Sequence, residues 1–193
     1  MTSIIDEMVA AARGCALLLI GNRQAPRYFD FSQRGLVGSF IALLVSTGFS
    51  AYFPVLLGMG GERGSITRGL IMSALLFAMQ VGFSALVLRQ IKRLDGLQPY
   101  LVADNWATFF LSIITTLLAL LGFGGDFAMI VTGLAVLVIE INIARLVVTL
   151  TPLQIAMFLI AQVVGVSIGL IVLGALMPLP PDVQADLQAA MLG

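Results

Sequence analysis

Five apolar stretches of the chain each approach the length that an α-helix needs to cross a lipid bilayer. About 20 apolar residues span a hydrocarbon core roughly 30 Å thick. The stretches cover approximately residues 35–57, 66–88, 105–121, 127–148 and 153–177, and the third is the shortest. Four of them carry no charge in their interior, and the fourth in order contains Glu140. The sequence therefore predicts an all-α integral membrane bundle of five transmembrane helices.

The composition of the chain excludes several classes of function. Its 193 residues are 60% hydrophobic and 10% charged, whereas soluble domains are roughly 45–50% apolar and about 25% charged. A net charge of zero predicts no binding to nucleic acid. Histidine is absent from the sequence, which removes the usual proton shuttle, metal ligand and catalytic base. We therefore expect a protein that is not an enzyme, with no catalytic residue, no metal site and no cofactor.

The distribution of basic residues predicts the orientation of the bundle, because cytoplasmic loops carry an excess of lysine and arginine. With five spans, eight of the ten basic residues fall on the side of the N-terminus: Arg13, Arg23, Arg27, Arg34, Arg89, Lys92, Arg93 and Arg145. The expected organisation is a cytoplasmic segment 1–34, a transmembrane domain 35–177 and an external tail 178–193. We expect this arrangement in a cell membrane, and specifically in a bacterial inner membrane.

The segment before the first span has the pattern of a helix. Ser3 and Asp6 have the spacing of a capping box, and Gly21-Asn22 is a plausible helix stop. Between them apolar residues recur at helical spacing, at Ile4, Ile5, Met8, Val9, Ala12 and Leu19. One interpretation is an N-terminal amphipathic helix in the inner interface of the bilayer. The other is a helix that packs beneath the bundle and has no role toward lipid.

Two stripes of small residues predict close contacts between helices, as small side chains allow backbones to approach each other in lipid. Each repeats at intervals of four residues. The first comprises Gly38, Ala42, Ser46 and Ser50, and the second comprises Ala161, Gly165 and Gly169. The second overlaps a G-x-S-x-G pattern around Ser167, which we interpret as helix packing because a hydrolase elbow needs a strand-to-helix turn and an activating base. The partner of either stripe, in this chain or another, stays open.

Glu140 is the most informative side chain of the predicted spans. A carboxylate near the centre of a membrane helix costs roughly 2.5–3.5 kcal/mol on insertion scales, so it should be neutralised, paired or turned inward. Gln80 and Gln162 match its depth, and we expect the three to form an intramembrane polar cluster. A structural hydrogen-bond clamp is the interpretation that we favour, and a path for protons or a solute is the alternative.

The start of the third span is predicted from turn and capping signals. Residues 94–100 contain Asp95-Gly96 and Pro99, which indicate a turn. Asp104 follows, and we expect it to cap the N-terminus of the third span, where a carboxylate suits the helix dipole.

The chain resembles the Yip1-domain family of small membrane proteins, in particular its bacterial members. The similarity lies in the cytoplasmic lead-in, the five closely spaced spans, the external C-terminus and the run Arg27-Tyr28-Phe29-Asp30-Phe31-Ser32. This resemblance implies a non-enzymatic protein that organises membranes or acts as an accessory subunit. We expect its partners to be the lipid bilayer and either another protein or further copies of itself. The alternative function is that of a transporter or channel subunit that uses the cluster around Glu140.

Overall fold

The computed structural model describes residues 3–56, 65–123 and 125–176 of the chain, and the predicted tail 178–193 lies outside them. The described residues form helices and contain no strand. Five helices are long and apolar enough to cross a membrane. They are α2 (Gln33–Leu56), α3 (Ser65–Gln90), α4 (Leu97–Leu120), α5 (Asp126–Asn142), which continues as a π-helical turn over Ile143–Val147, and α6 (Pro152–Leu176). The predicted all-helical fold and the number of long apolar helices are confirmed.

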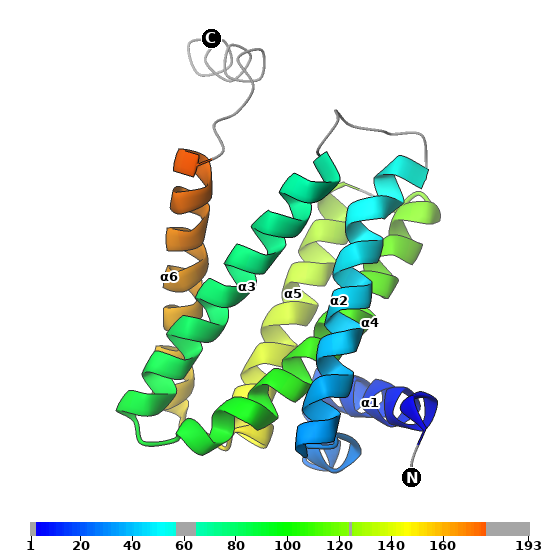
Figure 1. The fold of residues 1–193 in the computed structure, drawn as a ribbon. Helices are drawn as coiled ribbons and strands as arrows, with labels where there is room; N and C mark the ends of the chain where they lie inside the picture. Colours follow the sequence, from blue (N-terminus) through cyan, green and yellow to red (C-terminus); the bar gives the residue numbers. More distant parts are fainter. Residues whose placement is uncertain (1–2, 57–64, 124, 177–193) are drawn as a thin grey trace.

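A shorter helix, α1 (Ile4–Leu19), precedes them and lies across one end of the bundle, beside the lower part of α2 in Figure 1. The predicted capping box is confirmed: the Ser3 hydroxyl accepts from the Asp6 amide at 3.1 Å, and the Asp6 carboxylate accepts from the Ser3 amide at 2.9 Å. The predicted stop is also confirmed. Gly21 takes a φ of 66°, and the Asn22 amide donates to the Leu17 carbonyl at 2.9 Å.

The long helices pack as two close pairs, α3 with α6 and α2 with α4, while α5 contacts α4. Helices α2 and α3 contact each other much less. The connections from α3 to α4 and from α5 to α6 lie at the same end as α1, and α6 ends at the opposite end (Figure 1). This alternation is what the predicted orientation requires.

The start of α4 differs from the prediction. Gly96 is the N-cap, residues 97–100 are helical, and Asp104 lies inside the helix, so the predicted turn through Tyr100 and the cap at Asp104 are wrong. Pro99 is tolerated because it occupies the first helical turn, where amide groups have no intrahelical acceptor. Asp104 and Asn105 lowered the local hydropathy, but both are buried against neighbouring helices. In the sequence, the low hydropathy of these two buried polar residues was therefore mistaken for the start of the helix.

Candidate functional site

Buried and half-buried polar side chains from four helices gather around the hydroxyl of Tyr100 on α4. The hydroxyl accepts a hydrogen bond from the Gln80 amide of α3 at 3.0 Å and another from the Gln162 amide of α6 at 2.9 Å. The Tyr100 side chain is fully buried, and its ring contacts Phe158 edge-on with centroids 5.1 Å apart. That packing fixes the ring, and therefore fixes the position of the hydroxyl.

Gln162 connects this hydroxyl to Glu140 on α5. Besides Tyr100, its amide nitrogen lies 3.3 Å from the Ser84 hydroxyl and 3.5 Å from a Glu140 carboxyl oxygen. The structure thus places Glu140, Gln80 and Gln162 in one cluster, with Tyr100 between the two glutamines. Besides Tyr100, the cluster includes two more side chains that sequence reasoning did not assign to it, Ser84 and Asp104.

Asp104 and Glu140 form a carboxyl pair at the centre of the cluster. Their exposed fractions are 7% and 8%, and the two carboxyl groups lie close enough to interact with each other. Asp104 lies seven residues after Leu97 and Glu140 seven residues before Val147, which places both about 10 Å inside the ends of their helices. A carboxylate has no donor, so a hydrogen bond between two carboxyl groups requires at least one proton. Two carboxyl groups that share a hydrogen bond therefore hold at least one proton between them.

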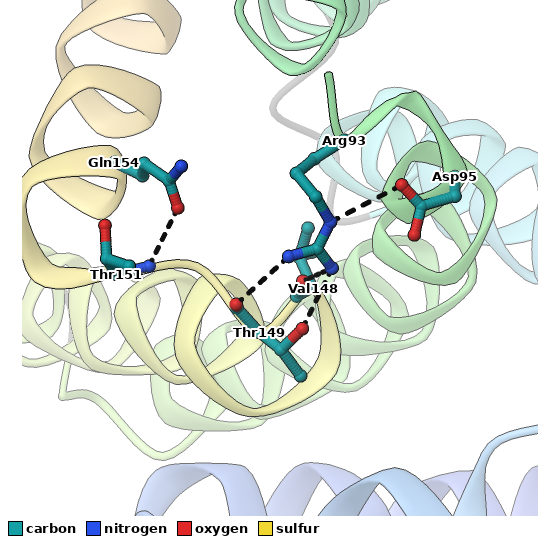
Figure 2. A network of polar contacts seen from close by, with 6 residues as sticks. All are labelled: Arg93, Asp95, Val148, Thr149, Thr151 and Gln154. Atoms are coloured by element: carbon teal, nitrogen blue, oxygen red, sulfur yellow. Dashed lines mark hydrogen bonds and ion pairs between the residues drawn. The ribbon is translucent and has the colours of Figure 1, made fainter. Parts of the chain in front are cut away.

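The chain that follows Glu140 is fixed by Arg93, which lies in the connection from α3 to α4. Its guanidinium donates to the Val148 carbonyl at 2.6 Å, to the Thr149 carbonyl at 3.3 Å and to the Thr149 hydroxyl at 2.9 Å (Figure 2). It also forms an ion pair with Asp95 at 3.4 Å. A cation at the carboxyl end of a helix satisfies carbonyls that have no intrahelical donor. The end of the π-helical turn after α5 is thereby anchored to the α3–α4 connection.

Helix α1 is joined to the same part of α5. The Asn142 amide donates to the Leu18 carbonyl at 2.8 Å, and the Arg145 guanidinium donates to the Gly21 carbonyl at 3.3 Å. Arg145, the nearest basic residue to Glu140 in sequence, therefore contacts the end of α1. The buried face of α1 comprises Ala11, Gly14, Cys15 and Leu18.

A second polar contact lies where α1 meets α2 and α4. Glu7 of α1 lies beside Trp106 of α4, and its Oε1 atom is buried and has no hydrogen-bond partner in the described part of the chain. Desolvation, followed by the nearby negative charge of Asp30, raises the pKa of Glu7, and Arg34 partly offsets this. Glu7 is therefore more easily protonated in the folded protein than in an unfolded chain.

A cavity of about 620 Å³ opens between α2, α3 and α4. Asp104 and Gln80 line it, and Phe40 and Phe77 contribute apolar wall. One member of the carboxyl pair therefore borders a space large enough for a small molecule.

The two small-residue stripes contact different helices. A Cβ atom at Gly165 would lie 2.9 Å from the ring of Phe83, and one at Gly169 would lie 3.0 Å from Leu76, so this stripe packs against α3. Half-buried Ala161 lies one turn before Gly165 on the same helix.

The stripe on α2 divides along its length. A Cβ atom at Gly38 would lie 2.6 Å from the Glu7 carboxylate of α1, while Ala42 and Ser46 are buried. Ser50 is exposed, and the close packing predicted for it is not observed.

Comparisons with protein families, with characterised proteins and with solved structures find no match to this chain. The resemblance to the Yip1-domain family stays a prediction. The site must therefore be interpreted from its own chemistry. Within the described ranges, no group of three or more His, Cys, Asp or Glu side chains could hold a metal ion.

One feature of the sequence could have identified Tyr100 and Asp104 as members of the cluster. Tyr100 and Asp104 are four positions apart, and such residues share one face of a helix. The signal was hidden because a turn was predicted over the first turn of α4.

Proposed function

We propose that this protein is a multi-pass protein of the cell membrane that moves protons through the Asp104–Glu140 pair, as a transporter or as a subunit of one. The proposal rests on a single observation, a buried carboxyl pair of which one member borders a cavity. Ionisable residues inside membrane helices are costly, and proton relays are one of the functions that they serve. A pair that retains a proton and can be reached from a cavity has the chemistry of such a relay.

Hydroxyl groups extend from this pair toward the end of the bundle opposite α1. A second cavity of about 320 Å³ shares Thr47, Ser73 and Thr108 with the first. It continues to Ser50 and Ser112, which line a third cavity of about 430 Å³. Hydroxyl groups both donate and accept hydrogen bonds, so they suit a row of waters that carries protons.

The opposite direction is closed by side-chain packing. Tyr100, Phe158 and Leu88 are fully buried between the pair and the end of the bundle that carries α1. With a cytoplasmic N-terminus and an external C-terminus, protons reach Asp104 from the external side. The resting structure is then closed toward the cytoplasm.

Proton flux into proteoliposomes tests the proposal. We expect wild-type protein to acidify vesicles that contain a pH-sensitive dye when a potassium diffusion potential drives protons inward. Glu140→Gln and Asp104→Asn should abolish this flux, because an amide cannot release a proton. Asp126→Asn is the matched control, since Asp126 is exposed at the start of α5. Wild-type flux equal to that of empty vesicles, or full flux in Glu140→Gln, contradicts the proposal.

A second candidate is a non-enzymatic membrane-organising or accessory protein, in which the cluster is only a clamp. The exposed apolar residues of α1 and of its C-cap favour it, because Ile5, Val9 and Ile20 are 62%, 47% and 74% exposed. In that case Glu140→Gln should be silent in every assay. Glu140→Leu should still destabilise the protein by about 1 kcal/mol, since it leaves polar groups unpaired.

A further inference from the structure

The cavity beside Asp104 has the size and the walls of a site for a small organic molecule. Its volume of about 620 Å³ falls within the roughly 300–1,000 Å³ of typical ligand sites. Most of the wall is apolar, with leucines from α2 and α3 and the rings of Phe40 and Phe77. The two rings meet edge-on, with centroids 5.9 Å apart and an interplanar angle of 87°. A ligand that fills this space must therefore have a substantial apolar surface.

The polar groups of the cavity select the charge of the ligand. Asp104 is the only acidic or basic side chain among its described lining residues, and Gln80 provides an amide. An anion would be repelled by a carboxylate at this position. A small, strongly hydrated metal ion would find one carboxyl group and apolar walls instead of the six or more oxygens that such ions require. A neutral acyl chain carries no charge that the Asp104 carboxylate could attract.

We propose that the cavity between α2, α3 and α4 binds a monovalent organic cation with an apolar body, held by the Asp104 carboxylate and the rings of Phe40 and Phe77. Aromatic faces attract cations, most strongly where water is excluded. Cations with a delocalised or shielded charge are weakly hydrated, so they lose little hydration free energy when they enter an apolar space. The inference rests on the proposed function, because it assigns this cation as the solute whose movement is coupled to the protons.

The rim of the cavity indicates how such a ligand enters. Leu44 on α2 and Leu70 on α3 both line the cavity and are 70% and 38% exposed. These leucines belong to helices that are apolar enough to cross a membrane. The opening between them would therefore face lipid, and a cation with an apolar body partitions into lipid before it reaches Asp104.

Charge balance predicts that cation binding is accompanied by the release of a proton, which can be measured. When the cation binds, the Asp104–Glu140 pair releases its proton to water, and the positive charge of the ligand replaces that of the proton. The titratable groups that face Asp104 are Glu140 on α5 and the Tyr100 hydroxyl on its own helix; the other polar groups of the cluster, on α3 and α6, are neutral. We therefore expect about one proton released for each cation bound.

Titration of the purified full-length protein with tetraphenylphosphonium tests the inference. Calorimetry in two buffers of different ionisation enthalpy gives both the affinity and the number of protons released. We expect saturable binding by the wild type, at least tenfold weaker binding by Asp104→Asn with no proton release, and wild-type behaviour of Asp126→Asn. Equal affinity in Asp104→Asn, or no wild-type binding above a detergent blank, would overturn the inference.

A second pair of variants tests the cavity without removing the acid. Ala74→Phe places a ring in the space that the ligand needs, whereas Ala156→Phe places the same ring on an exposed position of α6. We expect only Ala74→Phe to block binding while both proteins keep their thermal stability. A phospholipid that occupies the cavity and is not displaced by tetraphenylphosphonium, seen by native mass spectrometry, would overturn the inference.

The two proposals fail separately. Proton flux without cation binding would refute the ligand assignment and leave the proton pathway intact. Cation binding that depends on Asp104, without proton flux under any gradient, would refute the proposed function and leave the binding site.

Discussion

The amide nitrogen of Gln162 lies 2.9 Å from the hydroxyl oxygen of Tyr100 and donates a hydrogen bond to it. The contact connects α6 to α4, and the same hydroxyl accepts a second bond from Gln80 on α3. Three helices therefore meet at one oxygen atom, adjacent to the carboxyl pair. Both glutamine side chains are therefore oriented by the same hydroxyl group.

Removal of the Tyr100 hydroxyl should weaken the bundle. Tyr100→Phe leaves the Gln80 amide without its acceptor and removes one acceptor of Gln162, and a buried unsatisfied polar group costs about 1–3 kcal/mol. We expect a lower midpoint of thermal unfolding in detergent. Tyr52→Phe, at an exposed position, is the control and should leave the midpoint unchanged. Equal midpoints for the two variants would show that the hydroxyl contributes nothing to stability.

Enlargement of Gly165 should separate α6 from α3. The ring of Phe83 and the Met79 carbonyl lie 2.9 Å and 3.1 Å from the position of a Cβ atom, so Gly165→Leu must displace backbone. Overpacking of this kind costs about 1–3 kcal/mol. Gly174→Leu makes the same change on the same helix where nothing lies within 4 Å, and it should be harmless. Chemical unfolding of both proteins checks this, and a loss of stability confined to Gly174→Leu would contradict the packing.

The docking of α1 should depend on pH through Glu7. Because folding raises the pKa of Glu7 above its ordinary value of 4.5, the docked helix binds a proton more tightly than the undocked one. The contribution of Glu7 is fully favourable below pH 4.5 and is lost as the pH rises through the raised value. Glu7→Gln should remove this dependence and tighten docking at neutral pH.

Cys15 reports this docking, because it is the single cysteine of the chain and lies on the buried face of α1. Burial raises the pKa of its thiol to about 12, so alkylation should be slow until α1 leaves the bundle. The thiol itself becomes more reactive as the pH rises, and this effect is the same in both proteins. The ratio of the alkylation rates of Glu7→Gln and wild type at each pH therefore reports the docking of α1 alone. We expect the variant to react more slowly at neutral pH and equally at pH 4, below the ordinary pKa of Glu7. Faster alkylation of the variant at neutral pH would reverse the sign of the predicted effect.

Reporter fusions check the orientation of the bundle. A reporter near Lys92, in the α3–α4 connection, should lie in the cytoplasm, and one after Gly193 should lie outside. The bias of basic residues toward the end that carries α1 is the physical reason. A reporter fused in place of residues 122–125, between α4 and α5, is the internal control and should agree with the one after Gly193. A cytoplasmic signal after Gly193 would contradict a chain that crosses the membrane five times.

Features that depend on residues close together in the sequence could be predicted from the sequence. The number of long helices follows from the length of apolar stretches, and both ends of α1 follow from Ser3, Asp6 and Gly21. Counting residues along each span also matched the depth of Glu140 to that of Gln162. These features depend on distances along one helix axis, and sequence spacing measures such distances directly.

Properties that depend on rotation about the helix axis were decided by the tertiary structure. In a helix that is apolar on all sides, no polar face marks the direction of the core, so the sequence did not show that Tyr100 and Asp104 face Glu140. The same holds for the partners of the small-residue stripes. Only packing distinguishes Gly165, which meets Phe83, from Gly174, which meets nothing within 4 Å. The polar cluster exists because four helices bring together residues that are up to 82 positions apart, from Gln80 to Gln162.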